Sequence, residues 1–223
     1  MTRVLVVSGT GTGVGKTVVS AVLLARFKGI LPLAYWKPVA TGAREGRDTA
    51  TVGELCGPAV EVLPESYLFQ EPLSPHLAAR LEGAEIAPAL LLADLARHRG
   101  EGRRGLVVEG VGGLLVPFTD AGYLLADFLV AAELPCLLVA ASGLGTINHT
   151  LLTLEALRAR RLAVAGVVLA GPPNAENRRS IERLGAVPVV AEVAPLPAVD
   201  RAAVAGAARG FDPAGRLEPY LRA

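Results

Sequence analysis

Short uninterrupted apolar runs alternate along the chain with longer stretches in which apolar and polar residues mix. Short apolar runs bounded by glycine or proline are typical of strands buried on both faces of a parallel sheet, and the longer stretches predict helices. Predicted strands are 4–7, 33–36, 106–108, 137–141, 164–170 and 187–190; predicted helices are 18–25, 49–55, 77–81, 88–97, 124–132, 148–160, 175–184 and 199–208. Residues 61–76 look irregular and proline-punctuated, and 114–118 look extended.

This alternation predicts an α/β fold with a doubly wound, mostly parallel sheet and helices on both faces. No internal repeat or linker interrupts the pattern, so residues 1–223 are expected to form a single domain. Residues 134–154 carry no charge, which raises the question of a membrane span. Pro135, Gly143 and Gly145 interrupt the run, however, and favour a strand, a loop and the start of a helix.

The first strand leads into the glycine-rich turn Gly9-Thr10-Gly11-Thr12-Gly13-Val14-Gly15-Lys16-Thr17, and a helix follows. This is the context of a phosphate-binding loop, in which backbone N–H groups and a helix N-terminus surround phosphate oxygens. Lys16 would reach the β- and γ-phosphates, and the Thr17 hydroxyl would ligate Mg²⁺. Thr10 stands where the strict motif has glycine, so the loop is either one residue longer or uses Gly11. The alternative is a glycine-rich turn without a ligand.

The composition argues against several other classes of protein. A net charge of +1 and a pI near 7.8 give no sign of nucleic acid or an anionic membrane as a partner. Cys56 and Cys136 have no metal-ligand spacing and indicate no disulfide framework. Since the first strand begins directly after Met1-Thr2-Arg3, no signal peptide is expected, and a cytoplasmic location is the hypothesis.

Lysine is rare in this chain, which directs attention to the positions where it occurs. Of the 22 lysine and arginine residues, only three are lysines, namely Lys16, Lys28 and Lys37. A retained lysine suggests a need for a compact point charge that arginine cannot replace. Lys37 and Thr41 follow a predicted strand, at the sheet edge where open α/β proteins bind ligands. Lys37 is therefore a candidate catalytic residue, although a solvated charge at a strand end would have the same pattern.

Two carboxylates are candidate metal ligands. Asp48 opens a predicted helix, where a metal ligand and a simple N-cap are equally compatible with the spacing. Glu109 closes an apolar strand, as the second Mg²⁺ element of a phosphate-loop enzyme does, and the glycines after it allow backbone to approach a ligand. A strand-end carboxylate followed by a turn is the alternative. For His76 at a helix start, a structural role is favoured.

With these residues in place the chain resembles the dethiobiotin synthase family over nearly its whole length. The resemblance rests on the glycine-rich loop and on four further stretches, namely Lys37-Pro38-Val39-Ala40-Thr41-Gly42, Glu71-Pro72-Leu73-Ser74-Pro75-His76, Val108-Glu109-Gly110-Val111-Gly112-Gly113 and Gly145-Thr146-Ile147-Asn148-His149. The extra loop residue is a trait of this family. The resemblance implies a homodimeric ATP- and Mg²⁺-dependent cyclo-ligase that converts 7,8-diaminononanoate and CO₂ to dethiobiotin.

The resemblance also implies roles for individual residues. Lys37 and Lys16 match catalytic lysines; Thr17, Asp48 and Glu109 match Mg²⁺ ligands; Thr41 matches a substrate-binding hydroxyl. The implied ATP-binding residues are Gly13, Val14, Gly15, Lys16, Thr17, Val18, Asp48, Glu109, Gly110, Val111, Gly112, Gly171, Pro172, Ala194, Pro195 and Leu196. The implied substrate-binding residues, besides Lys37 and Thr41, are Gly145, Thr146, Ile147 and Asn148, the last four acting across the dimer.

One departure from the family concerns the nucleotide base. Relatives carry Asn where this chain has Gly171-Pro172, so backbone groups there and around 194–196 would have to hold the base, and base selectivity stays open.

Two other phosphate-loop classes share the general pattern. ParA- or MinD-like ATPases usually carry an additional lysine early in the loop, and residues 9–15 contain none. Cobyrinate amidases have a similar loop but continue into a glutaminase domain, for which this chain has no room.

Overall fold

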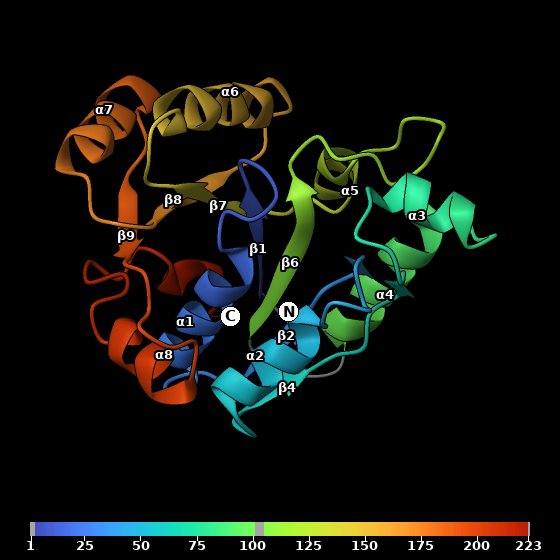
Figure 1. Ribbon diagram of the computed structural model, residues 1–223, viewed down its shortest axis with the longest axis horizontal. Coiled ribbons are helices and arrows are strands. Elements are labelled where there is room, and N and C mark those ends of the chain that lie inside the picture. Colours follow the sequence, from blue (N-terminus) through green and yellow to red (C-terminus); the bar gives the residue numbers. More distant parts are fainter. Residues whose placement is uncertain (1–2, 101–104, 223) are drawn as a thin grey trace.

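The computed structural model describes residues 3–100 and 105–222 and has a seven-stranded sheet at its centre (Figure 1). The strand order is β4-β2-β6-β1-β7-β8-β9, and each pairing is parallel. These strands are β1 (Arg3–Gly9), β2 (Leu33–Trp36), β4 (Val60–Val62), β6 (Gly105–Gly113), β7 (Cys136–Ala141), β8 (Val164–Ala170) and β9 (Val189–Val193). The predicted doubly wound parallel sheet is confirmed.

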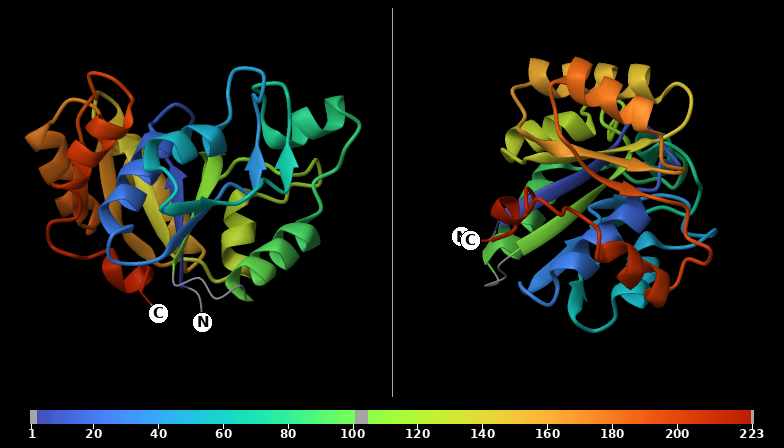
Figure 2. Two further views of the ribbon diagram at one scale, coloured as in Figure 1. Left: turned by 90° about the horizontal axis from the view of Figure 1, so that it is seen from below. Right: turned by 90° about the vertical axis from the view of Figure 1, so that its left-hand side faces the viewer.

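Helices cover both faces of this sheet (Figure 2). One face carries α1 (Lys16–Phe27), α2 (Asp48–Cys56), α8 (Arg201–Ala208) and the 3₁₀ turn η1 (Glu218–Tyr220). The other carries α3 (Pro75–Leu81), α4 (Pro88–Gly100), α5 (Leu125–Ala131), α6 (Thr146–Ala159) and α7 (Ala175–Gly185).

Strand alternation divides the apolar side chains between two cores. In β1, Val4 and Val6 join the core under α4 to α7, whereas Leu5 and Val7 join the core under α1, α2 and α8. Successive side chains of a strand point to opposite faces, so an uninterrupted apolar strand supplies both layers. This is why the buried strands are the best-predicted elements of the chain.

The centre of the sheet is β1, with β6 on one side and β7 on the other. The loops after these strands therefore meet at one edge, where ligands bind in open α/β sheets. β6 is longer than predicted: Glu109 pairs with Val7 and lies inside the strand, and Gly113 still pairs with Gly9. Between these two pairs the register shifts, and Gly112 has a positive φ of 61°, so the strand is irregular where the glycines follow Glu109.

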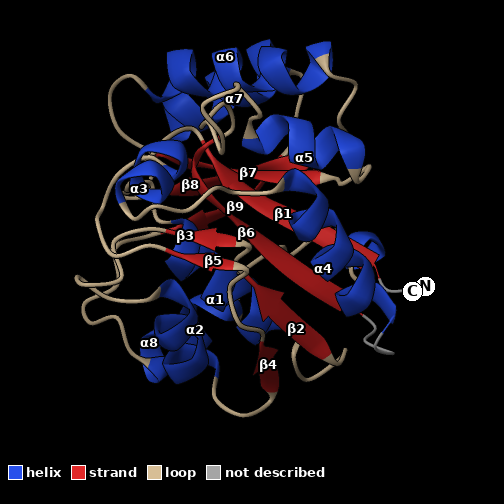
Figure 3. Ribbon diagram, turned by 90° about the vertical axis from the view of Figure 1, so that its right-hand side faces the viewer, coloured by secondary structure: helices blue, strands red, loops and turns tan. Residues whose placement is uncertain are grey.

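Three short strands that the sequence did not indicate lie in or before the region 61–76, which was expected to be irregular. β4 extends the main sheet, and β3 (Val39–Ala40) pairs with β5 (Tyr67–Leu68) in a separate two-stranded sheet (Figure 3). Strands of two or three residues have too little periodicity to be recognised. Their parallel partners are supplied by segments far away in the sequence.

The uncharged stretch 134–154 contains β7 and the start of α6, as predicted. Within the described ranges, no helix is long and apolar enough to cross a membrane.

Candidate functional site

The glycine-rich loop curves tightly between β1 and α1. Gly13 and Gly15 have positive φ angles of 73° and 90°, which side chains disfavour. A Cβ on Gly9 would lie 2.9 Å from the Gly11 carbonyl oxygen, so backbone occupies that space. Helix α1 begins at Lys16, with Thr17 in its first turn and Val18 partly buried against the core. The loop therefore directs the N-terminus of α1 toward the ligand edge of the sheet.

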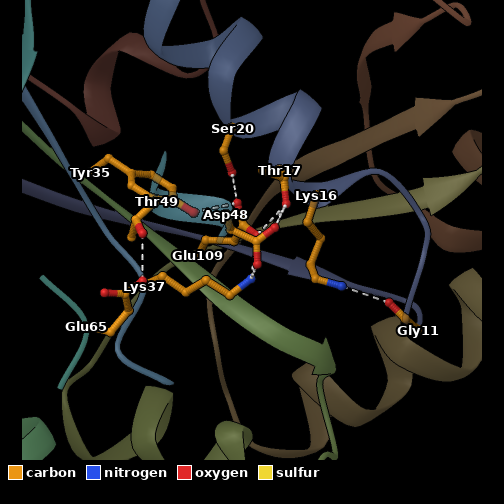
Figure 4. Close-up of polar contacts among 10 residues, drawn as sticks. All are labelled: Gly11, Lys16, Thr17, Ser20, Tyr35, Lys37, Asp48, Thr49, Glu65 and Glu109. Carbon is orange, nitrogen blue, oxygen red and sulfur yellow. Dashed lines mark hydrogen bonds and ion pairs between the residues drawn. The ribbon is translucent and has the colours of Figure 1, made fainter. Parts of the chain in front are cut away.

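Thr17, Lys37, Asp48 and Glu109 converge at the start of α1 (Figure 4). The Thr17 hydroxyl lies 2.7 Å from Asp48 Oδ1 and 3.0 Å from Glu109 Oε1. Lys37 Nζ forms ion pairs with Asp48 Oδ2 and with Glu109 Oε1, the latter at 2.9 Å. Sequence reasoning predicted these four residues separately, and the fold brings them together.

Glu109 is completely buried and has a hydrogen-bond partner at each oxygen. Besides Thr17 and Lys37 at Oε1, Ser20 Oγ donates to Oε2 at 2.8 Å and the Tyr35 hydroxyl donates to Oε2 at 3.0 Å. A buried carboxylate is costly unless it is paired and hydrogen-bonded. This set of donors meets that requirement and fixes the carboxylate plane.

Lys37 is buried as well, at 4% exposure. Burial by itself opposes its charge, but Glu109 and Asp48 outweigh this effect and raise the pKa of Lys37. The interpretation of Lys37 as a solvated strand-end charge is therefore wrong, because its ammonium lies between two carboxylates.

Asp48 lies at the outer side of the site, with 34% of its side chain exposed. It is the first residue of α2, and the N-cap position belongs to Arg47. Its carboxylate contacts Lys37 and Thr17, and these contacts outweigh burial and lower the pKa of Asp48. The N-cap alternative is therefore excluded.

The two neighbours of Asp48 in the sequence are held by Glu65. Arg47 Nη2 donates to Glu65 Oε2, and Thr49 Oγ1 donates to Glu65 Oε1, both at 2.6 Å. Burial disfavours ionisation of Glu65, but these hydrogen bonds prevail and lower its pKa. Glu65 thus anchors the backbone on both sides of Asp48.

Lys16 is the second lysine of the site and is largely buried. Its Nζ donates to the Gly11 carbonyl oxygen at 2.9 Å, across the loop. Burial lowers its pKa to about 8, although Glu109 acts in the opposite direction. A polyphosphate in the loop would supply the negative charge that favours the protonated form.

A cavity of about 540 Å³ opens beside the carboxylates. Several predicted site residues line it, and other lining residues come from the loops before α2 and α3. The predicted residues in its wall are Thr41, Asp48, Val111 and Gly112. Gly110 is instead covered, since a Cβ there would lie 2.7 Å from Leu125 Cδ2. The cavity has room for a small organic substrate next to Asp48.

The oxygen atoms of the site fit a divalent cation such as Mg²⁺, which prefers hydroxyl, carboxylate and phosphate ligands. Thr17 has one hydroxyl proton but lies within hydrogen-bond distance of two carboxylate oxygens, so it can donate to only one of them. Across residues 3–100 and 105–222, no group of three or more His, Cys, Asp and Glu side chains could hold a metal. The Thr17 hydroxyl beside the two carboxylates is the further oxygen that the described residues offer to a cation.

The residues predicted to hold the base lie side by side at the ends of β8 and β9. The Gly171 amide donates to the Val193 carbonyl, which brings Gly171-Pro172 next to the 194–196 loop. A Cβ on Gly15 would lie 3.3 Å from Ala170 Cβ, so the phosphate loop is adjacent. Gly171 has a φ of 131°, and a Cβ there would lie 2.4 Å from Ser142 Oγ. The positive φ and the neighbouring hydroxyl therefore favour glycine at position 171.

The predicted substrate residues Gly145, Thr146, Ile147 and Asn148 lie at the beginning of α6. Gly145 and Asn148 are exposed, Ile147 is partly buried and Thr146 is buried. None of the four lines the 540 Å³ cavity of their own chain. Any contact with a substrate in that cavity would have to be made in another subunit.

Sequence reasoning missed three residues that support the site: Ser20, Tyr35 and Glu65. Signals for two of them were present. Ser20 follows Thr17 by one helical turn, and Tyr35 shares the inward face of its strand with Leu33. Nothing local indicated Glu65.

Comparisons with known proteins show which families and folds the whole chain resembles. A family model described as an AAA domain matches residues 3–203. The ATP-dependent dethiobiotin synthetase BioD of Paramagnetospirillum magneticum is 46% identical over 204 residues, which are 92% of this chain and 94% of that relative. The biotin biosynthesis bifunctional protein BioCD of Bordetella avium is 48% identical over 205 residues, which are 91% of this chain and 42% of that protein.

Solved structures with a similar fold include two from other functional classes. The septum site-determining protein MinD of Pyrococcus horikoshii with Mg-ADP has a TM-score of 0.59 at 16% identity, covering 95% of this chain and 87% of the other. A ParA family ATPase of Chlorobium tepidum has a TM-score of 0.56 at 11% identity, covering 99% and 94%. At such identities the likeness shows the fold alone.

Proposed function

The chain belongs to the ATP-dependent dethiobiotin synthetase family, and from this premise we propose that it closes the ureido ring of dethiobiotin on 7,8-diaminononanoate. It is an ATP-dependent ligase of biotin biosynthesis. CO₂ or bicarbonate supplies the ring carbon, and ATP supplies the driving force. The enzyme works on small molecules in the cytoplasm and requires Mg²⁺. The observation that carries the proposal is the convergence of Thr17, Lys37, Asp48 and Glu109 beside a substrate-sized cavity.

In this proposal Thr17, Asp48 and Glu109 hold Mg²⁺ together with the phosphates of ATP. The metal supplies charge neutralisation on the transferring phosphoryl group. The glycine-rich loop binds the phosphates through its N–H groups, with Lys16 at its end. The base lies against Gly171-Pro172 and the 194–196 loop, where backbone groups hold it.

The chemistry has three steps. One amine of the substrate attacks CO₂ and loses a proton, which leaves a carbamate. A carbamate oxygen then attacks the γ-phosphorus and expels ADP, forming a carbamic–phosphoric anhydride. The second amine attacks the carbonyl carbon, phosphate departs, and a second proton is released as the ring closes. No residue of the chain forms a covalent intermediate, so catalysis consists of positioning and electrostatic stabilisation.

The second step is the demanding one, because a carbamate anion approaches a polyphosphate. Two unit charges of the same sign about 4 Å apart repel by roughly 4 kcal/mol at an effective dielectric of 20. Lys37 reaches this region from the end of β2, and Lys16 reaches it from the phosphate loop. We assign Lys37 to the carbamate and the moving phosphoryl group, where its charge stabilises the transition state. Thr41, in the cavity wall, holds the substrate with its hydroxyl.

Product formation tests the proposal directly. The protein, incubated with the diamine, ATP, Mg²⁺ and bicarbonate, should form dethiobiotin, ADP and phosphate in equal amounts. Hydrolysis of ATP without dethiobiotin would contradict the function. A second measurement, with the base varied, would establish how strongly the Gly171-Pro172 site distinguishes ATP from other nucleoside triphosphates.

We also propose that the enzyme is a homodimer built on the face that contains α6. Leu115, Leu144 and Leu152 are exposed to 49%, 108% and 56%, and a groove of about 310 Å³ runs between the end of β6 and α6. Leu115 and Leu152 line this groove, and Leu144 directly precedes the predicted substrate loop 145–148. A second copy would cover these leucines and bring its 145–148 loop toward a neighbouring cavity.

A charge placed on that face tests the dimer. Leu152→Arg should give a monomer in sedimentation velocity and should lower activity, because each site would lose the loop supplied by its partner. Ile30 is 50% exposed after α1 and outside this groove, so Ile30→Arg is the matched control and should stay dimeric. A fully active monomer would contradict the shared site.

A further inference from the structure

Two buried hydroxyl groups contact Glu109 on the side away from the proposed metal. Ser20 and Tyr35 are both completely buried, and both donate to Oε2 rather than to Oε1. The proposed mechanism uses neither of them. Figure 4 shows the two hydroxyls on one side of the carboxylate, and Thr17 and Lys37 near it on the other.

A count of lone pairs shows what these two contacts do. A carboxylate oxygen has about two lone-pair sites, and each hydroxyl has one proton to donate. The contacts of 2.8 and 3.0 Å therefore use both sites of Oε2. A tyrosine hydroxyl carries its proton at neutral pH, so Tyr35 donates to Oε2. At Oε1 the Lys37 ammonium uses one site, and when Thr17 donates its single proton to Asp48 the other site of Oε1 is left for a cation.

The fold builds this arrangement from rigid elements. Tyr35 in β2 pairs with Val107 in the adjacent strand β6, and Glu109 follows Val107 on the same face of the sheet. Ser20 comes from the same face of α1 as Thr17, one turn later. Each donor thus belongs to a strand or helix in the core, not to a loop. The carboxylate cannot rotate without breaking at least one buried hydrogen bond.

We propose that Ser20 and Tyr35 are positioning residues that restrict Glu109 to one ligating oxygen and thereby select a small divalent cation. This inference rests on the proposed metal site of Thr17, Asp48 and Glu109. Mg²⁺ requires near-octahedral geometry with short bonds, which a single carboxylate oxygen suits. Ca²⁺ accepts more ligands and takes carboxylates in either the single or the bidentate mode. When Oε2 is occupied, the bidentate mode that would favour Ca²⁺ is closed.

Competition for bound Mn²⁺ tests the proposal without any reliance on activity. Mn²⁺ is bound to the protein with a non-hydrolysable ATP analogue and followed by electron paramagnetic resonance, while Mg²⁺ or Ca²⁺ displaces it. The reported quantity is the Ca²⁺ concentration for half displacement divided by the corresponding Mg²⁺ concentration. The affinity of the analogue for each metal is common to all variants, so it cancels when their ratios are compared.

The variants remove one hydroxyl at a time. Tyr35→Phe keeps the ring, Ser20→Ala keeps most of the volume, and the double variant frees Oε2. Loss of groups that orient a metal ligand typically changes affinity by about 10- to 100-fold. We expect the Ca²⁺-to-Mg²⁺ ratio to fall about 3-fold in Tyr35→Phe and about 10-fold or more in the double variant. If the double variant does not fold, Tyr35→Phe alone provides the test.

Tyr67→Phe is the matched control. Its hydroxyl accepts one hydrogen bond, from the Ala87 amide at 2.9 Å, and β5 is outside the site. This variant loses one tyrosine hydrogen bond, as Tyr35→Phe does, and its metal ratio should remain that of the wild type. A general loss of stability would weaken Mg²⁺ and Ca²⁺ binding together and would leave the ratio unchanged.

The outcomes separate this inference from the proposed function. Undiminished Mn²⁺ binding in Glu109→Ala would remove Glu109 from the metal site and would overturn the positioning role, whereas the ring-closing function would still be decided by dethiobiotin formation. Diminished binding in Glu109→Ala with an unchanged ratio in Tyr35→Phe and in the double variant would overturn only the positioning role.

Discussion

The two carboxylates of the site differ in how the fold holds them. Glu109 lies inside the central part of the sheet, has no exposed surface and has a donor at each oxygen. Asp48 begins a helix at the cavity wall, with 34% of its side chain exposed, and its support comes indirectly through Glu65. One side of the proposed metal site is therefore fixed by the core, and the other side faces the 540 Å³ cavity. The rigid part of the proposed site thus comes from strand β6, and the part open to the cavity comes from the start of helix α2.

The largest effect is expected on the free energy of unfolding, when each carboxylate is replaced by its isosteric amide. Glu109→Gln removes a buried charge and leaves Lys37 inside the protein with only Asp48 as its ion-pair partner, so we expect about 3–5 kcal/mol of destabilisation. Asp48→Asn removes a partly exposed charge and should cost roughly 1 kcal/mol or less. Urea denaturation at neutral pH measures both. Both variants should need more Mg²⁺ for half-maximal rate; equal losses of stability would contradict the comparison.

The second test concerns Lys37, which joins the two sides. We expect Lys37→Gln to lower kcat by roughly 10² or more, because one electrostatic stabiliser of the transition state is lost. ATP affinity should remain within a few-fold, since Lys16 and the loop provide the phosphate contacts. Lys37→Arg should recover little, because the broader guanidinium has its donors fixed in a fork.

Calorimetric ATP binding and steady-state rates measure these effects, and Lys16→Gln is the comparison. That variant should weaken ATP binding as well as turnover, because its interaction is present in both ground and transition states. Normal turnover in Lys37→Gln would remove Lys37 from the mechanism.

The third test loosens the outer side alone. Glu65→Gln removes the ionised partner of Arg47, and because the Arg47 side chain is 47% exposed we expect a loss of roughly 1 kcal/mol. Since the folded pKa of Glu65 is lowered, its contribution is complete above the unfolded pKa near 4.5 and is lost as the pH falls through the folded value. The difference in unfolding free energy between wild type and Glu65→Gln should shrink below that pH. A difference that grows with acid would contradict this assignment.

The smallest effect is expected at Thr41 in the cavity wall. Thr41→Ser keeps the hydroxyl and should change kcat/KM for the diamine by about 2-fold at most. Thr41→Val keeps the shape but loses the hydroxyl, and should raise KM more than it lowers kcat if Thr41 binds the substrate uniformly. Steady-state kinetics with the diamine varied distinguishes the two. Equal behaviour of Ser and Val variants would show that the hydroxyl does not contact the substrate.

Sequence reasoning reached the residues that carry local signals. The glycine-rich loop is a single continuous motif that ends in Lys16 and Thr17. The apolar runs before Lys37 and Glu109 predicted that each residue closes a strand. Their meeting point followed from the rule that parallel strands share a ligand edge. For Asp48 the spacing left a cap and a ligand equally open; the structure excludes the cap and places the carboxylate against Thr17 and Lys37, and the ligand role stays a prediction.

The supporting residues depend on which strands are neighbours, and a single sequence does not contain that information. Tyr35 reaches Glu109 only because β2 pairs with β6, which comes much later in the sequence: Tyr35 is the partner of Val107. Glu65 lies in the proline-rich stretch where short strands have no periodic pattern. The roles proposed for 145–148 would be supplied to a second subunit, which the fold of one chain does not contain.

The position of β1 at the centre of the sheet also has a consequence for synthesis of the protein. β1 is made first, yet Val4 pairs with Leu106 and Val6 with Cys136. At roughly 5–20 residues per second, a ribosome needs several seconds to supply these partners. During that time the apolar residues 4–7 of β1 have no native neighbouring strand, and the Thr17 hydroxyl has no contact with Glu109. We therefore expect nascent chains that end before β6 to depend on chaperones and to bind no nucleotide.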